Sequence, residues 1–591
     1  MMIRFGLVIS LLLSATSVIA EGKKAYFGDL HVHTRYSFDA FLFGTRTSPD
    51  DAYRFAKGEA IEHSGGFDLQ LDRPLDFYSV TDHAFYLGMW SAMDDPDHEL
   101  ANDPEARKFL DAKTRVDRRI AFQTAGAFLS QHFNKRDVHT AWEDIQATAE
   151  RHNDPGNFTA FIGYEYTSAR DGNLHRNVIY KGSKAPGLPF SRLDSLNPED
   201  LWDWMDSERA KGIESLAIPH NSNGSNGNMF DLVKFAGEPL DADYAKQRMR
   251  NEPLVEITQV KGTSDTHPFL SPNDEWADFE IFPYQIARWT KSRPQGSYVR
   301  EAWLNGLSME KRGFNPYLFG VVGASDTHNS GEQFDESKFV SKVGTLDSDA
   351  ENRGSIPIPT TDGSIAFREV YNRFFSAAGL AAVWAEENTR DAIFDAFQRK
   401  ETFGTSGPRM KVRLAVGYDI AAEVLNSKRA LSNAYANSTL QGGELKAKRR
   451  GNPRFLAWAS ADPLGTRLQR LQVIKGWIDK GQTHEEVFDV ACSDGLTVDT
   501  TTHRCPDNGA KVDIADCSIT AGVGAGELKA VWVDPTFDSK QRAFYYVRVL
   551  ENPTCRWSTW DAVKAGTQTR PDLATTIQER AWTSPVWIKP H

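Results

Sequence analysis

Between residues 26 and 407, short apolar runs alternate with stretches that have the features of helices. The runs are continuously apolar, as is typical of strands that are covered on both faces. Strands that alternate with helices predict a parallel β/α architecture. The expected strands are Tyr26–Leu30, Phe77–Val80, Thr159–Tyr164, Ser215–Ile218, Leu254–Ile257 and Leu318–Val322.

Helix-start signals lie between these runs. Ser48-Pro49-Asp50-Asp51 combines an N-cap residue with proline and two acids, and Asn197-Pro198-Glu199-Asp200 repeats the pattern. Thr389 is a suitable N-cap for a later amphipathic segment. We therefore expect helices over 52–57, 201–210 and 391–400.

The chain of 591 residues is too long for one ordinary domain, and its pattern of expected strands and helices changes near residue 410. Longer apolar runs at 471–477, 528–533 and 544–550 are separated by Gly, Asn and Asp turns, with few helices. This pattern favours a β-rich, sandwich-like domain. We expect a β/α domain over 25–410 and a β-rich domain over 411–591.

The first twenty residues have the features of a secretory signal. Arg4 supplies a positive start, residues 7–13 are largely apolar, and Val18-Ile19-Ala20 fits a cleavage site. The alternative, a membrane anchor, needs about 20 apolar residues. We expect removal of residues 1–20, a periplasmic or secreted protein, and no stable membrane insertion after cleavage.

Four cysteines, all near the C-terminus, agree with export: Cys492, Cys505, Cys517 and Cys555. An even number in an exported chain favours two disulfides, with four buried free thiols as the alternative. Three pairings are possible, and proximity favours Cys492–Cys505 with Cys517–Cys555. The formal net charge of -12 argues against nucleic acid as a partner. An anionic substrate stays possible, because bound cations reverse the local field.

Imidazoles and carboxylates follow the expected strands. In a β/α barrel the C-terminal strand ends converge on one face, so these side chains would meet there. Histidines with carboxylates and no thiolate suit zinc, manganese or iron. The alternative, incidental or structural histidines, must explain each placement separately. The segments are His31-Val32-His33, Thr81-Asp82-His83, Glu165, Pro219-His220-Asn221 and Ser325-Asp326-Thr327-His328.

Three segments, in this order, resemble the motifs of the PHP (polymerase and histidinol phosphatase) superfamily. They are Phe27-Gly28-Asp29-Leu30-His31-Val32-His33-Thr34-Arg35-Tyr36-Ser37-Phe38-Asp39, Ser79-Val80-Thr81-Asp82-His83 and Ala324-Ser325-Asp326-Thr327-His328. The resemblance covers about residues 25–410. Gly163-Tyr164-Glu165-Tyr166-Thr167 and His175-Arg176-Asn177-Val178 are further similar to an exported branch known as a domain of unknown function.

The resemblance implies a distorted, TIM-like (β/α)7 PHP barrel that holds two or three divalent metal ions. One metal would take His31, His33, Glu165 and Asp326; a second would share Glu165 and take His175 and His220; a third would take Asp39, His83 and His328. Asp39 stands where some relatives have histidine, and aspartate is also a competent ligand. The alternative for His175 is a solvated loop histidine. Asp82 is expected to orient its neighbours.

A metal-dependent hydrolase, by resemblance a phosphoesterase, is the function that these features favour, with a metal-bridging hydroxide as the nucleophile. Asp82 and His83 are candidate proton donors. Arg35, Arg170, Arg176 and Arg409 are candidate clamps for a phosphate ester, with surface salt bridges as the alternative, and His267 is a candidate pocket residue. We interpret Glu256 and Lys261 as a structural salt bridge. Other functions left open are hydrolysis of carboxylic esters or amides, and metal or glycan binding without turnover.

Overall fold

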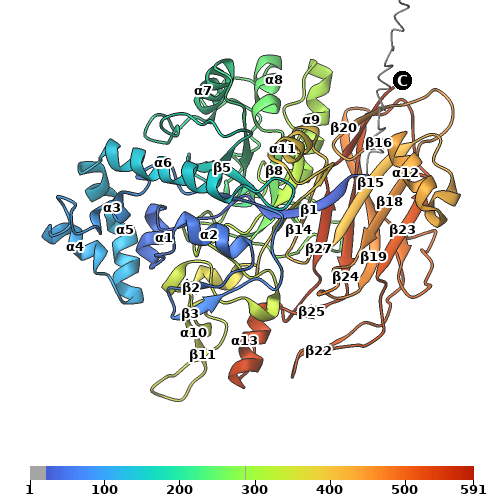
Figure 1. Ribbon diagram of the computed structural model, residues 1–591. Coiled ribbons are helices and arrows are strands. Elements are labelled where there is room, and N and C mark those ends of the chain that lie inside the picture. Colours follow the sequence, from blue (N-terminus) through green and yellow to red (C-terminus); the bar gives the residue numbers. More distant parts are fainter. Residues whose placement is uncertain (1–21, 287) are drawn as a thin grey trace, which may run out of the picture.

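The computed structural model describes residues 22–286 and 288–591, so the expected signal peptide lies outside the described residues. One large mixed sheet runs through the molecule, with the strand order β17-β28-β24-β27-β14-β13-β1-β4-β5-β6-β7 (Figure 1). Its strands are β1 (Lys24–Asp29), β4 (Phe77–Val80), β5 (Thr159–Tyr166), β6 (Arg176–Tyr180), β7 (Ser215–Pro219), β13 (Leu380–Ala385), β14 (Thr402–Thr405), β17 (Glu444–Lys446), β24 (Ala543–Glu551), β27 (Arg580–Thr583) and β28 (Val586–Lys589), with β19 (Leu468–Asp479) and β20 (Gln482–Cys492) joined beside β24.

All six strands expected in the first part of the chain are present. β1, β4 and β5 are parallel neighbours, and β8 (Leu254–Gln259) is parallel to β10 (Gly320–Gly323). Every residue of β4, β5, β7 and β8 is buried, which explains their continuous apolar runs. The carboxyl ends of β1, β4 and β5 therefore lie at one edge of the large sheet.

A regular (β/α)7 barrel is not confirmed. β6 lies antiparallel between β5 and β7, and β13 is antiparallel to β1. Only residues 167–175 join β5 to β6, which is too short for the crossover that parallel neighbours require. Within the described residues no ladder joins β7 to β8, so the strands do not form one closed sheet.

The helices begin at the capping signals in the sequence. Ser48 forms a capping box with Asp51 at the start of α2 (Pro49–Ala56), and Asn197 caps α7 (Pro198–Ala210). Thr389 caps α11 (Arg390–Arg399). The insertion between β4 and β5 holds α5 (Arg115–Gln131) and α6 (Lys135–His152), which lie opposite the C-terminal strands in Figure 1.

The last part of the chain is β-rich, as expected. A four-stranded sheet of β16 (Thr439–Leu440), β15 (Lys411–Gly417), β18 (Arg454–Ser460) and β23 (Glu527–Trp532) packs against the large sheet. Phe455 of β18 contacts Tyr545 of β24 with a ring-centroid distance of 4.4 Å. β14 pairs with β27, so the large sheet continues across the position where a domain boundary was expected.

Both expected disulfides, Cys492–Cys505 and Cys517–Cys555, are confirmed, and no described cysteine is free. Among residues 22–286 and 288–591, no helix combines the length and the apolarity needed to cross a membrane.

Replacing both Cys517 and Cys555 with serine should lower the free energy of unfolding by about 4 kcal/mol, because this disulfide restricts a long loop of the unfolded chain. The same change at Cys492 and Cys505 should cost less, about 3 kcal/mol. The sequence separations are 38 and 13 residues. Urea unfolding measures both values, and an unchanged midpoint in the first variant would contradict the expectation.

Candidate metal centre

The predicted ligands come from strand ends that are tied to one another. His31 and His33 follow β1, and His33 N donates to Thr327 O at 2.9 Å. Residues Val32 and Thr327 form a parallel bridge, as do His83 and Glu165. Strand-like pairing thus continues past the ends of β1, β4 and β10, and it fixes the loops that carry the ligands.

Glu165, at the end of β5, is the central carboxylate. Its Oε1 lies 2.6 Å from His175 Nδ1 and 3.3 Å from His220 Nε2. Its Oε2 lies 3.2 Å from His33 Nε2 and 3.1 Å from His83 Nδ1. The side chain is 1% exposed. The two oxygens therefore face different imidazoles, as in a carboxylate that bridges two cations.

Asp326, beyond β10, has one oxygen turned toward histidines. Its Oδ1 lies 3.4 Å from His31 Nε2 and 3.5 Å from His33 Nε2. Its Oδ2 accepts a hydrogen bond from Gln259 Nε2 at 2.8 Å and pairs with Lys261. The Asp326 φ of 57° lies in the left-handed region, where non-glycine residues are strained, and such strain is typical of functional sites.

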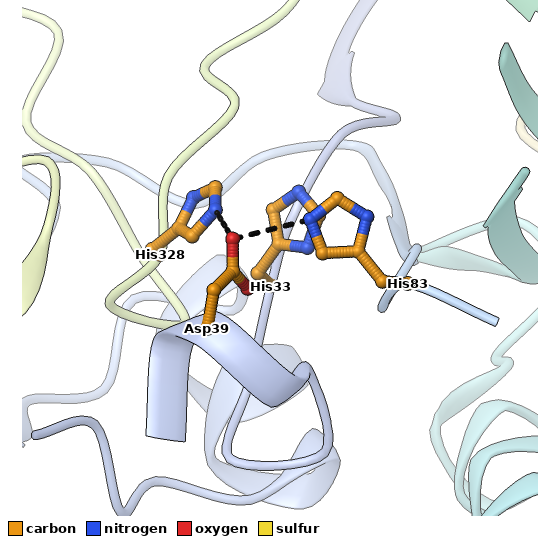
Figure 2. Close-up of side chains that lie close together, drawn as sticks. All are labelled: His33, Asp39, His83 and His328. Atoms are coloured by element: carbon orange, nitrogen blue, oxygen red, sulfur yellow. Dashed lines mark hydrogen bonds and ion pairs between the residues drawn. The ribbon is translucent and has the colours of Figure 1, made fainter. Parts of the chain in front are cut away.

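Asp39, which lies on α1 (Phe38–Phe43), faces a second set of imidazoles, as Figure 2 shows. Its Oδ2 lies 3.2 Å from His83 Nε2 and 3.0 Å from His328 Nε2. One ligand atom from each of these residues and from His33 lies within 4.8 Å of the others. The four residues thus form a compact group of donors.

All of the predicted ligands fall into four such overlapping groups, and one further residue, Glu256, joins them. The division of the ligands among these groups differs from the predicted division. His33 also belongs to the group of Asp39, and Glu256 belongs to the group of His31 and His220. The groups are His33, Asp39, His83 and His328; His31, His33 and Asp326; His31, His220 and Glu256; and Glu165, His175 and His220.

Unpartnered ring nitrogens show that these residues fit metal ions. His31 Nε2 and His33 Nε2 are buried without a hydrogen-bond partner among the described residues. Their other nitrogens are engaged, because His31 Nδ1 lies 3.0 Å from Glu256 Oε1 and His33 Nδ1 lies 2.8 Å from Ser37 Oγ. A metal-binding histidine typically binds the ion through one ring nitrogen and forms a hydrogen bond through the other.

Burial sets the charge of several imidazoles. It lowers the pKa of His175 to about 3 and that of His220 to about 4, although Glu165 acts in the opposite direction. Both rings are therefore neutral at pH 7, which is the form that binds metals. Burial also opposes the charge of His83, but Glu165 and Asp39 outweigh it and raise the pKa of His83 to about 10.

Two lysines and a glutamate near the centre were not predicted to act there. Lys261 pairs with Asp326, while Glu256 contacts His31, so the expected Glu256–Lys261 salt bridge is wrong. Lys342 Nζ lies 3.1 Å from Asp326 Oδ1 and 2.8 Å from His328 Nδ1. No motif surrounds Lys342 in the sequence, and only the folded chain brings it to the centre.

Asp82 is buried beside the ligands, in none of the four groups of donors. Its Oδ1 accepts from Thr34 N at 2.6 Å, and its Oδ2 accepts from Thr34 Oγ1 at 2.7 Å. These bonds hold the loop that follows His33, which is the orienting position expected for Asp82.

None of the four predicted arginines lines the cavity above the metal centre. Arg176 is buried, and its Nε lies 2.7 Å from Glu252 Oε1. His175 faces the centre, so the next side chain along the chain points away from it. Arg170 instead stacks on Phe235.

The remaining predicted substrate residues also lie elsewhere. Arg409 donates to the carbonyls of Arg73 and Pro74, both at 2.7 Å. Arg35 lies over the Tyr36 ring, and His267 packs against Tyr298 with ring centroids 5.4 Å apart. The cavity above the metal centre has a volume of about 290 Å³. Its cationic residues are Arg192, Lys261, Arg288 and Lys342, and its aromatic walls include Phe38, Phe85, Phe122, Phe282, Phe375 and Tyr371.

Comparison with known proteins gives one family. The model of the family described as "Protein of unknown function (DUF3604)" matches residues 20–590. No curated protein matches the chain. Among solved structures, a two-domain protein from Bacteroides vulgatus ATCC 8482, which contains a predicted PHP-like metal-dependent phosphoesterase, is similar at 11% identity. The match covers 87% of this chain and 96% of that chain, with a TM-score of 0.30, which is too low to support an argument.

In metal-free protein, His220 should make stability depend on pH. The folded-state pKa of about 4 lies below the usual 6.5, so the unfolded chain binds the proton first as the pH falls. The free energy of unfolding should therefore be greatest above pH 6.5 and should fall toward pH 4. His220 should account for up to about 3 kcal/mol of this fall. Urea unfolding in chelator should show a shallower decline for His220→Asn than for the exposed control His139→Asn. Equal declines would contradict this.

Proposed function

The chain belongs to the DUF3604 family, and we propose that it is an exported, metal-dependent phosphoesterase with a PHP-like catalytic centre. The observation that carries the proposal is the buried Glu165 carboxylate, whose two oxygens face separate imidazoles within overlapping groups of metal donors. The donor types suit two or three ions of zinc, manganese or iron. The two disulfides favour an oxidising location, either periplasmic or secreted.

The residues of the chain would orient and hold these ions. Bound divalent cations supply Lewis acidity and bring the pKa of a water molecule from about 15.7 to near 7. Glu165 and Asp326 each present a carboxylate oxygen to the histidines. Asp82 fixes the loop after His33 through Thr34. His83, which lines the cavity, would hold an ion together with Asp39 and His328.

The cations that line the cavity favour a phosphate ester over a carboxylic ester or amide. Arg192 and Arg288 line the same cavity as the metal donors. Lys342 and Lys261 also line it, but both are engaged with Asp326. Cationic side chains bind the oxygens of phosphate strongly, whereas a neutral carboxylic ester offers them little. The aromatic walls favour a small anionic substrate that also carries an apolar group.

Turnover by the metal-loaded mature chain tests the proposal. We expect hydrolysis of p-nitrophenyl phosphate or of bis(p-nitrophenyl) phosphate, loss of activity with a chelator, and recovery with Zn²⁺, Mn²⁺ or Fe²⁺. His33→Ala and Asp326→Ala should each lower kcat/KM by at least about 100-fold, because each removes a metal donor. His139→Ala is the matched control, since its side chain is exposed.

Two outcomes would contradict the proposal. Faster hydrolysis of p-nitrophenyl acetate than of either phosphate would assign the centre to carboxylic esters. Metal retention without turnover of any of the three would indicate a binding protein.

Arg192, one of the two arginines that line the cavity above the metal centre, should act on substrate binding. Arg192→Ala is expected to raise KM for the phosphate substrate about tenfold, because it removes a positive charge from the cavity wall. Metal content should stay unchanged, and the exposed Arg136→Ala should leave KM unaltered. Steady-state kinetics measures KM, and elemental analysis measures the metal content of each variant. An unchanged KM in Arg192→Ala would exclude a role of Arg192 in substrate binding.

A further inference from the structure

A second cavity, of about 330 Å³, lies between the first part of the chain and the C-terminal β-rich part. Its walls come from residues 71–73, 333–337 and 407–409 on one side. On the other side they come from Asp462, Leu464, Gly465, Thr466, Cys517, Ile519, Glu551, Thr554, Trp560 and Glu579. It shares no lining residue with the cavity above the metal centre. A ligand here would bind independently of the metals.

Acids outnumber bases in this cavity, and its bases are already engaged. Arg73 pairs with Asp462, and the Arg409 guanidinium donates to the carbonyls of Arg73 and Pro74. Neither arginine is left to neutralise the deeper acids. The lining carboxylates are Asp72, Asp335, Glu336, Asp462, Glu551 and Glu579.

Three of these acids are buried without a cation of their own. Glu551 is 1% exposed, Glu579 4% and Glu336 6%. Within residues 22–286 and 288–591, none of the three forms an ion pair. The nearby Arg556 is held by Glu280, with both of its contacts to that carboxylate at 2.8 Å. The cavity therefore gathers these three carboxyl groups, none of them paired with a cation of the described chain, where water is scarce.

The Glu551 carboxylate has an oxygen that lacks a hydrogen-bond donor among the described residues, and a ligand in the cavity could supply one. Its Oε2 accepts from Thr466 Oγ1 at 3.0 Å, but its Oε1 is buried with no hydrogen-bond partner. An unpaired buried carboxylate is costly, so such groups are normally paired. Burial raises the pKa of Glu551 to about 8, as expected for an acid that has no cation beside it.

The cavity suits an organic cation better than a metal ion. None of the compact donor groups among the described residues includes Glu336, Glu551 or Glu579. The volume is also far larger than an ion needs. Trp560 lines the wall, and an aromatic ring attracts ammonium groups and packs against alkyl chains.

We propose that this cavity binds a small aliphatic amine, whose ammonium group donates to Glu551 and Glu579 and whose alkyl chain packs against Trp560. An ammonium has three donors, enough for the free Oε1 of Glu551 and for a second carboxylate. Because the two parts of the chain each supply walls, a bound amine would also link them.

Calorimetric titration of the metal-loaded mature chain with spermidine and with putrescine tests the proposal. We expect one amine per chain, with a Kd below about 1 mM at about 0.15 M salt. Glu551→Gln should weaken binding at least about tenfold, and Trp560→Leu should weaken it as well. Glu527→Gln, which removes an exposed carboxylate of β23, is the matched control and should bind like the wild type.

The remaining variant separates this site from the metal centre. His33→Ala should lose metal but bind spermidine with unchanged affinity. Absence of binding at about 10 mM amine would overturn the proposal, as would equal affinities in wild type, Glu551→Gln and Trp560→Leu. Binding of Ca²⁺ or Mg²⁺ that excludes spermidine and is lost in Glu551→Gln would assign the cavity to a metal instead. If Glu551→Gln does not fold, Trp560→Leu and Glu579→Gln decide between these results.

Discussion

The buried Glu165 carboxylate is the interaction on which the arrangement of the centre depends. A charge removed from water must be compensated nearby, and among the four histidines around Glu165 the raised pKa of His83 makes it the positive partner. His33, His175 and His220 lie within 3.3 Å of the carboxylate as neutral rings. Each of these histidines follows or precedes a strand whose position the sheet fixes. The fold and the chemistry are therefore linked through one side chain, because any shift of β5 would move Glu165 relative to all of its partners.

The sequence predicted the positions of strands and donors because both follow local rules. Apolar runs marked β1, β4, β5, β7 and β10, and most of the predicted donors lie at or just beyond the ends of these strands. The pairing direction of β6 follows from the short loop between β5 and β6, which carries no apolar pattern, so the sequence did not predict β6 or the burial of Arg176. Lys342 and Glu256 carry no motif, and their roles arise only from tertiary contacts.

The C-terminal part completes the fold instead of standing apart from it. β14 pairs with β27, which carries the sheet of the first part into the last strands of the chain. Arg548 of β24 reaches back to Asp274 at 2.7 Å, where both side chains are buried. Separate stability of the two parts is therefore not expected. The acidic cavity lies along this junction, whereas the metal centre lies within the first part.

Elemental analysis of the purified protein beside its Glu165→Gln variant shows whether Glu165 organises a cluster of metal ions. The glutamine keeps the size of the side chain but has only one oxygen and no charge. We expect more than one equivalent of divalent metal in the wild type, and in the variant the loss of most of this metal with the fold retained. Equal metal content in the two proteins, or none in either after reloading, would contradict it.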